Sequence, residues 1–447
     1  MVFFKQMTSS IKKIILIVGD MGILYLSLYL ALFLRYGNEF DSQIWQSHLA
    51  PFSLVYLSWL AIFYLARLYE PSFAKNDYAF YSAFLKSMAI AGFFAIGIFY
   101  IMPTLPISPK TNLVINIAVF SILFAGWRQI YNTFLRSSAL SKKVLFVGEN
   151  KEVAELVLLF NSNPQLGYKV LEPLLDTNTD IKELVRKEKI NIIVNAKGSI
   201  EEKEFTKILY SLLPLGVTVY DISRFYPEIT KKIPVSIIGE TWFLENLLEV
   251  EKGVYEAAKR ISDIIFASVL GLITLPFFPF IALAIILETK GGAFYTQDRV
   301  GKNEKIFKLL KFRTMVQDAE KEGVQWTTDK DARVTKVGNI LRRTRIDELP
   351  QLWNVIRGDM SFIGPRPERP EFVMTLEKEI PHYQMRHLVR PGLSGWAQIN
   401  QPLGDASVKE STEKLQYDLY YIKNRSLVFD LDITARTIMV VLRRQGH

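Results

Sequence analysis

Two neighbouring carboxylates, Asp347 and Glu348, stand among basic residues in the stretch RRTRIDELPQLWNVIRGDMSFIGPRP, which begins at Arg342. Arginine binds phosphate oxygens in a bidentate geometry, and an ionised carboxylate beside a bound diphosphate can attack phosphorus and form an acyl phosphate. The pair can also simply open a helix through LPQLWNVI, because acids favour the first turn. The two interpretations are compatible, since nearby arginines are expected to keep a carboxylate ionised.

Further basic residues flank this pair. KLLKFRTM contributes Lys311 and Arg313, and the GPRP turn presents Arg366 between two prolines that stiffen it. Taken one at a time, each is an ordinary solvated cation. Together they carry enough charge to hold a diphosphate, and magnesium needs only one or two carboxylates beside phosphate oxygens. The pattern therefore predicts phosphate chemistry.

The composition limits the kinds of ligand and catalytic site that the chain can have. The chain has 447 residues, is 49% hydrophobic and carries a net charge of +9, with a mean hydropathy of +0.15. A basic balance favours phosphate ligands, nucleic acid or an anionic membrane. The absence of cysteine excludes disulfides, zinc–thiolate sites and thiol catalysis, and the four histidines lack metal-ligand spacing. No aromatic and basic platform for nucleic acid is evident, so no nucleic-acid partner is expected.

Four apolar segments occupy residues 14–34, 49–68, 80–102 and 113–135. Each is close to the length of about 20 residues that a bilayer core requires. Lysines and arginines concentrate before the first segment, around the second loop and after the fourth. The positive-inside tendency predicts a cytoplasmic N-terminus and a return to the cytoplasm after four crossings. Residues 1–140 are thus predicted to form a four-helix transmembrane bundle.

Residues 141–250 differ from the preceding segments in their hydrophobic pattern. Strand-like runs KKVLFVGEN, INIIVNA and GVTVYD alternate with helical stretches, which predicts a small parallel, Rossmann-like α/β domain. VGENKEVAE has only one of the three glycines that a dinucleotide loop needs. A scaffold or regulatory role is therefore favoured over dinucleotide binding.

A fifth apolar run spans residues 261–287 and contains Pro276 and Pro279, each of which removes a helix hydrogen bond. Basic residues flank both ends, which favours a re-entrant helix–break–helix over a kinked fifth spanning helix. The closing stretch LVFDLDITARTIMVVLRR is expected to lie at the membrane surface.

The C-terminal part resembles the bacterial sugar transferase family, the polyprenyl-phosphate sugar-1-phosphate transferases of monotopic architecture. The matching stretches, in family order, are QDRVGKNEKIFKLLKFRTM, DARVTKVGNILRRTRIDELPQLWNVIRGDMSFIGPRPERPEF, VRPGLSGWAQIN and YDLYYIKNRSLVFDLDI. The four apolar segments and the degenerate α/β domain are similar to the long subclass. The resemblance implies a mainly α catalytic domain at residues 251–447.

The resemblance also implies an activity. The enzyme would transfer a sugar 1-phosphate from a UDP-sugar to undecaprenyl phosphate, at the cytoplasmic face of the bacterial inner membrane. Asp347 matches the nucleophile that forms a phosphosugar intermediate, and Glu348 matches the second acid, so both are expected to bind Mg²⁺. The residues that match phosphate-binding positions are Lys311, Arg313, Arg342 and Arg366.

The sequence departs from the family pattern in places. The re-entrant helix usually breaks at Ser-Pro, whereas Leu275 and Pro276 stand here, so the break must depend on the prolines. Gln401 and Arg425 replace a frequent glycine and tryptophan. These changes lie away from the acid pair and leave the reaction class intact.

Two other functions remain open. A membrane-bound nucleotide-sugar dehydratase or epimerase would use a YxxxK pair, and YEAAK at 255–259 matches by letter, although no glycine-rich loop accompanies it. A non-catalytic regulator of polysaccharide export would not need the intact acid pair. A homodimer is the commonest oligomeric state for such a chain, and the transferred sugar cannot be read from the sequence.

Overall fold

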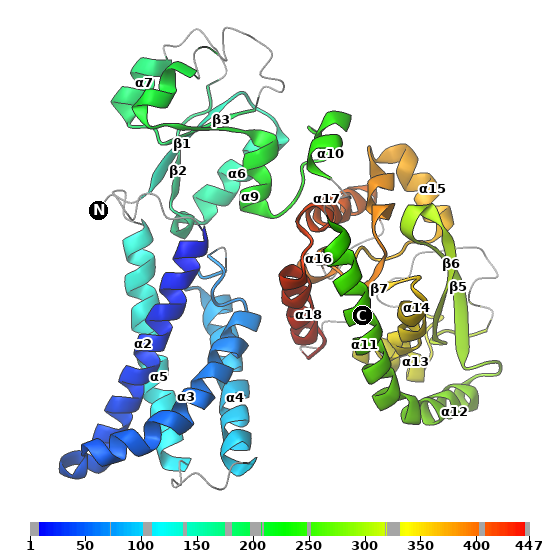
Figure 1. Ribbon diagram of the computed structural model, residues 1–447, viewed down its shortest axis with the longest axis horizontal. Helices are drawn as coiled ribbons and strands as arrows, with labels where there is room; N and C mark the ends of the chain where they lie inside the picture. Colours follow the sequence, from blue (N-terminus) through cyan, green and yellow to red (C-terminus); the bar gives the residue numbers. More distant parts are fainter. Residues whose placement is uncertain are drawn as a thin grey trace. The chain divides into compact units, whose positions relative to one another are not determined.

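The computed structural model describes residues 9–71, 73–101, 110–136, 141–174, 181–196, 207, 210–247, 252–317, 319, 331–401 and 407–442. The chain forms two compact units, Met1–Ile222 and Ser223–His447. It is mostly helical, with a small parallel sheet in the first unit (Figure 1). Within the described ranges, five helices are long and apolar enough to cross a membrane.

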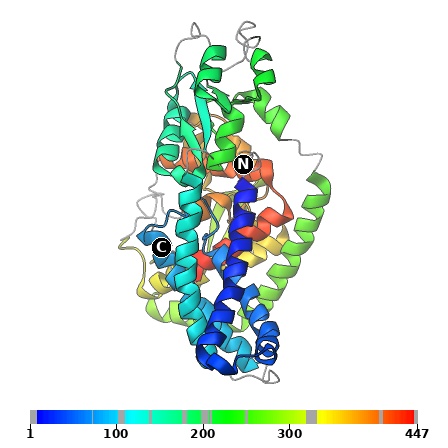
Figure 2. The ribbon, with the colours of Figure 1, turned by 90° about the vertical axis from the view of Figure 1, so that its left-hand side faces the viewer.

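Four of these helices belong to the first unit: α2 (Ser9–Tyr36), α3 (Ser42–Leu65), α4 (Tyr78–Ile101) and α5 (Lys110–Arg136). They share one buried apolar core that includes Trp59, Phe63 and Phe120. Helices α2 and α5 run side by side in both views (Figure 2). The four predicted apolar segments correspond to these helices, although the second runs three residues past the end of α3 and residue 102, the predicted end of the third, lies outside the described residues.

The sheet of the first unit has four parallel strands in the order β2-β1-β3-β4. They are β1 (Lys142–Val147), β2 (Tyr168–Val170), β3 (Ile192–Asn195) and β4 (Thr218–Asp221), with α6 (Lys151–Ser162) and α7 (Ile181–Glu188) between them in sequence. The parallel sheet and three of its strands were predicted. The three-residue β2 was missed, and the Rossmann-like assignment stays a prediction.

The second unit combines short strands with many helices. Its strands are β5 (Phe294–Val300), β6 (Ile306–Phe312), β7 (Ser361–Ile363) and β8 (Gly392–Ser394). Its α-helices are α9 (Ile222–Thr230, beginning at the unit boundary), α10 (Glu240–Asn246), α11 (Gly253–Thr274), α12 (Phe278–Glu288), α13 (Lys336–Thr344), α14 (Leu352–Arg357), α15 (Pro370–Glu379), α16 (Trp396–Asn400), α17 (Val408–Asn424) and α18 (Leu427–Leu442). Its 3₁₀ turns include η5 (Leu275–Phe277), η7 (Ile346–Gln351) and η8 (Tyr383–Leu388).

The fifth apolar run forms α11, η5 and α12. Helix α11 ends at Thr274, and the 3₁₀ turn η5 begins at Leu275 and contains Pro276, so regular helix stops where the sequence places the break. The chain changes direction between α11 and α12 (Figure 1). Proline accounts for the bend, because it cannot donate the main-chain hydrogen bond of a regular helix.

Residues 233–243 contribute to the apolar core of the second unit. Ile233, Val235 and Phe243 lie in the same apolar core as Leu415 and Leu419 of α17. This segment precedes residue 250, where the sequence analysis divided the chain.

Candidate active site

The β5–β6 hairpin carries one wall of the candidate site, and Asn354 of α14 holds it in place. The Asn354 side chain accepts from the main-chain nitrogen of Leu310 (3.0 Å) and donates to the main-chain oxygen of Lys308 (2.8 Å). Asn354 is 1% exposed. It thereby fixes the part of β6 that presents Lys311.

Helix α13 crosses the end of β6 at very close range. A Cβ atom on Gly338 would collide with the main chain of Thr314, so only glycine allows this approach. Near the end of the helix, Arg342 donates from Nε to Thr314 Oγ1 (2.9 Å). Arg345 then takes a left-handed conformation (φ 57°) that ends α13 and starts η7.

Glu348 of η7 is held by two arginines. Its Oε1 accepts from Arg366 Nη2 (2.8 Å) and from Arg345 Nη1 (3.1 Å). Burial alone would raise the pKa of Glu348, but Arg366 and Arg345 outweigh burial and lower it. Glu348 is therefore a fixed negative charge at neutral pH.

Asp347 has a different environment from its neighbour. It is 8% exposed, and its Oδ1 has no hydrogen-bond partner among the described residues. Burial and the adjacent Glu348 charge raise the pKa of Asp347 against the opposing effect of Lys311, Arg342 and Arg345. Desolvation therefore outweighs the cations at Asp347, whereas the arginines outweigh desolvation at Glu348.

A cavity of about 430 Å³ opens beside the acid pair. Among the described residues, its lining has seven cationic side chains and a single carboxylate, that of Glu368. The cations are Arg299, Lys311, Arg313, Arg333, Arg342, Arg366 and Arg369. The four predicted phosphate-binding residues are thus brought together. Asp347 and Glu348 are not among the lining residues, but Glu348 contacts the cavity cation Arg366 from η7, which packs along β6, and Lys311 and Arg342 act electrostatically on Asp347.

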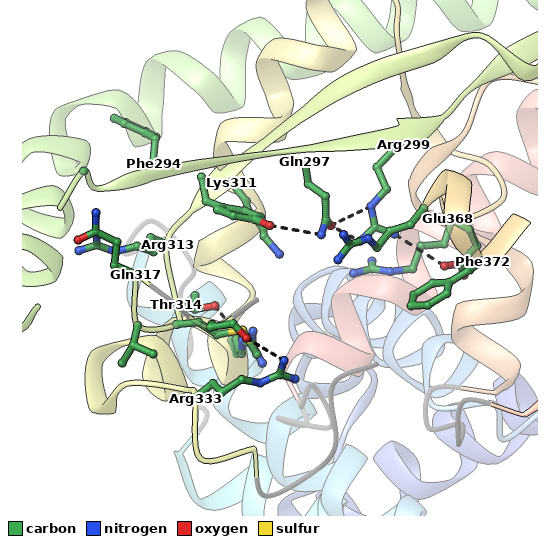
Figure 3. A pocket seen from close by; sticks show the side chains of 18 residues that line it. Phe294, Gln297, Arg299, Lys311, Arg313, Thr314, Gln317, Arg333, Glu368 and Phe372 are labelled. Atoms are coloured by element: carbon green, nitrogen blue, oxygen red, sulfur yellow. Dashed lines mark hydrogen bonds and ion pairs between the residues drawn. The ribbon is translucent and has the colours of Figure 1, made fainter. Parts of the chain in front are cut away.

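Figure 3 shows side chains that line the cavity. Phe294, Arg313 and Gln317 lie on one side of the view, Arg299 and Phe372 lie on the other, and Lys311 lies between them. A cavity of this volume and charge suits a diphosphate flanked by two larger groups.

Lys311 and Arg313 differ in what they can offer a ligand. The Lys311 ammonium lies 5.1 Å from the centre of the Tyr295 ring and makes no hydrogen bond within the described structure. Arg313 donates to the main-chain oxygens of Lys290 (3.0 Å) and Thr289 (2.9 Å) at the end of α12. Lys311 is therefore available for an anion, whereas the guanidinium of Arg313 already supports the protein's own backbone.

The sequence analysis missed three cavity cations, Arg299, Arg333 and Arg369. All three stand in family stretches, QDRV, DARV and GPRPERPEF, but nothing in local spacing shows that they face the acid pair. Strand alternation offered the one usable signal, because Tyr295, Gln297 and Arg299 share a face of β5.

The donors present can accommodate a magnesium ion. Asp347 offers a carboxylate oxygen that has no partner among the described residues, and Glu348 is the neighbouring acid. In the described part of the chain, no cluster of three or more aspartate, glutamate or histidine side chains is available to a metal. An ion here would therefore take its remaining ligands from water and substrate phosphate, as magnesium commonly does.

The YEAAK pair has a structural role. Tyr255 and Lys259 of α11 both donate to Asp430 Oδ2 of α18, at 2.8 and 2.7 Å. These contacts fix the start of the apolar run to the folded unit. They leave neither side chain placed as the acid–base pair that a dehydratase needs.

Comparisons with known proteins identify a family for the part of the chain that contains this cavity. The family model described as bacterial sugar transferase matches residues 254–444. UDP-N-acetylgalactosamine-undecaprenyl-phosphate N-acetylgalactosaminephosphotransferase of Aeromonas hydrophila is 41% identical over 247 residues, which is 54% of this chain and 56% of that protein. The match therefore spans little more than half of that relative's length.

Two further relatives extend the comparison. UDP-glucose:undecaprenyl-phosphate glucose-1-phosphate transferase of Escherichia coli (strain K12) is 32% identical over 337 residues, 70% of this chain and 69% of that protein. A putative undecaprenyl-phosphate N-acetylgalactosaminyl 1-phosphate transferase of Bacillus subtilis (strain 168) is 54% identical over 132 residues, 30% of this chain and 74% of that protein. The chain belongs to the bacterial sugar transferase family and is, as a member of it, an enzyme.

Proposed function

We propose that this enzyme is a phosphoglycosyl transferase that moves a sugar 1-phosphate from a UDP-sugar to undecaprenyl phosphate, releasing UMP. This would be the first membrane step in assembling an exopolysaccharide, capsule or O-antigen. The observation that carries the proposal is a cation-lined cavity beside Asp347, a buried carboxylate with an unpartnered oxygen. The named activities of the relatives support the same reaction class.

In the first step, a carboxylate oxygen of Asp347 attacks the β-phosphorus of the UDP-sugar. The bond between that phosphorus and the bridging oxygen breaks, and the oxygen leaves with UMP. The enzyme then carries an aspartyl phosphosugar. Lys311, Arg342 and Arg366 border the cavity and would neutralise the charge that develops on the phosphoryl oxygens, which supplies much of the rate in such transfers.

In the second step, a phosphate oxygen of undecaprenyl phosphate attacks the same phosphorus. The Asp347–phosphorus bond breaks, the carboxylate is regenerated, and the product is undecaprenyl diphosphate sugar. Neither step requires an added proton donor, because each leaving group departs as an anion.

Asp347 and Glu348 have different roles, which follow from their different environments. The pKa values of Asp347 and Glu348 are displaced in opposite directions, an arrangement that separates the roles of paired carboxylates in other enzymes. Glu348 keeps Arg366 and Arg345 in place, and Asp347 reacts. Magnesium held by the two acids would neutralise part of the diphosphate charge.

We further propose that α11–η5–α12 enters the membrane and returns on the same side. Both of its ends contact the same folded unit, through Lys259 at one end and through Glu288 at the other. Glu288 accepts from the main-chain nitrogen of Lys336, the first residue of α13 (2.7 Å). Side chains such as Leu272, Phe277 and Phe280 are highly exposed, as lipid contact would require. The active site would then lie at the cytoplasmic face, and the four helices of the first unit would span the membrane.

The first experiment is UMP release by the full-length purified protein with magnesium and undecaprenyl phosphate. The donor panel should include UDP-N-acetylgalactosamine and UDP-glucose, which the relatives' names specify, beside UDP-galactose and UDP-N-acetylglucosamine. Asp347→Asn removes the nucleophile, and Asp298→Asn is the matched control, because Asp298 is an exposed aspartate on β5 outside the cavity lining.

We expect one donor to give UMP release that Asp347→Asn abolishes and Asp298→Asn preserves. Release that survives in Asp347→Asn would refute the covalent mechanism. Absence of release with every donor would refute the transferase proposal and favour the regulatory alternative.

A further inference from the structure

The GPRP turn that carries Arg366 is fixed by main-chain contacts on several sides. Gly364 N donates to Ser394 O, and Pro365 O accepts from Gly392 N, both at 2.9 Å. Adding a Cβ to Gly364 or Gly392 would bring it into collision with the opposing main chain. The start of the turn is therefore held by the loop around β8.

The next two carbonyls of the turn are each held by an arginine side chain. Arg386 Nη2 donates to the main-chain oxygen of Arg366 (2.9 Å), and Arg299 Nη1 donates to that of Pro367 (2.8 Å). The orientation of the Arg366 peptide is thus set by Arg386. On the other side of the same residue, the Arg366 guanidinium meets Glu348.

Arg386 is itself held by a buried partner. Its Nη2 also donates to Asp418 Oδ2 of α17 (2.9 Å), and its Nη1 donates to the Tyr383 hydroxyl. The side chains of Arg386 and Asp418 are only 5% and 2% exposed. One nitrogen therefore joins a buried carboxylate to the backbone of the turn.

The neighbouring histidine does not share this role. Burial and the adjacent Arg386 lower the pKa of His387 to about 3, so its ring is neutral at physiological pH. Its Nε2 has no hydrogen-bond partner among the described residues. His387 therefore adds no positive charge behind the turn.

We propose that Asp418 and Arg386 are positioning residues: they hold the main-chain oxygen of Arg366 so that its guanidinium meets Glu348 beside the diphosphate cavity. The catalytic consequence rests on the function proposed above. The contacts also give a role to two stretches, MRHLVRPGLSG and YDLYYIKN, that carry no reacting group in the proposed mechanism.

The test compares two double variants of the full-length enzyme. The neutral-pair variant, Arg386→Gln with Asp418→Asn, removes both charges, so that neither is left buried alone. The control-pair variant is Arg425→Gln with Glu256→Gln. Arg425 also pairs with a carboxylate (3.2 Å) and donates to a main-chain oxygen (2.8 Å), but at the end of α17 and not at the turn.

Each double variant is measured alone and combined with Arg366→Ala. The neutral-pair variant should lower kcat/KM for UMP release at least about 10-fold, since small misplacements of reacting groups are costly. In the Arg366→Ala background its effect should shrink to less than about 3-fold, because residues that act through one another are not additive. The control-pair variant should change kcat/KM by the same factor in both backgrounds.

If the neutral-pair variant lowers kcat/KM by the same factor with Arg366 present and with Arg366→Ala, the inference is overturned. Hydrogen–deuterium exchange provides a readout without turnover: exchange of the peptide covering residues 361–372 should rise in the neutral-pair variant and stay unchanged in the control pair. Unchanged exchange in both would also overturn it. If wild type releases no UMP, the proposed function fails, while the exchange result still decides the positioning claim. Should the neutral-pair variant not fold, Arg386→Lys keeps a positive charge beside Asp418 but loses the forked donors that also hold the main-chain oxygen of Arg366, so it should show the same pattern more weakly.

Discussion

Asn354→Ala tests whether the wall of the cavity depends on one buried amide. The substitution removes the partners of two main-chain groups of β6, the nitrogen of Leu310 and the oxygen of Lys308. Because Asn354 is buried, water cannot replace its amide without local opening of the structure. The strand that presents Lys311 should loosen as a result.

The size of the effect follows from the number of groups left unpaired. A buried donor or acceptor without a partner costs about 1–3 kcal/mol, so two of them should cost about 2–6 kcal/mol. That is a large part of the roughly 5–15 kcal/mol that stabilises a typical domain. For a domain of about 150–250 residues, 1 kcal/mol corresponds to about 2–4 °C in Tm, so a fall of roughly 4–24 °C is expected.

The assay is thermal unfolding of the purified protein followed by tryptophan fluorescence, together with kcat/KM for UMP release below the transition. The matched control is Asn424→Ala, because Asn424 makes an exposed hydrogen bond within α17 and should change Tm by less than about 2 °C. A Tm for Asn354→Ala within that margin of wild type would refute the reasoning.

Three further predictions concern pH, packing and topology. Burial and nearby cations lower the pKa of Lys311 to about 8, so kcat/KM, which reports the free enzyme, should fall as pH rises through that value. Lys311→Arg should move this decline to higher pH, and an unchanged profile would contradict the assignment. Gly338→Ala should lower Tm and kcat/KM together, because the new Cβ would displace α13 from Thr314; wild-type values for both would show that the helix can shift without cost. The re-entrant segment can be tested by cysteine labelling, since the chain has no cysteine of its own. Val254→Cys, in α11, and Lys305→Cys, which follows α12, are made separately, and both should react with an impermeant maleimide only in inside-out vesicles. Labelling of the two positions from opposite sides would disprove the re-entrant segment.

Local sequence was a sufficient guide wherever one segment decides its own structure. The apolar segments were found by length and composition, and the helices follow them. The break at Leu275 and Pro276 was also predictable, because the missing donor of proline acts within its own helix. The three-residue β2 escaped prediction because it is a strand only through its pairing with β1.

The sequence by itself determined that an acid pair, several cations and a stiff turn would be available in one region of the chain. Tertiary structure decided what each of them does. The sequence predicted the same phosphate-binding role for Arg366 and Arg313. In the structure, Arg366 reaches Glu348, whereas Arg313 reaches the carbonyl groups at the end of α12. The opposite pKa shifts of Asp347 and Glu348 likewise arise from burial and from charges brought close in space. Distance and desolvation set these electrostatic effects, and neither can be read from spacing along the chain.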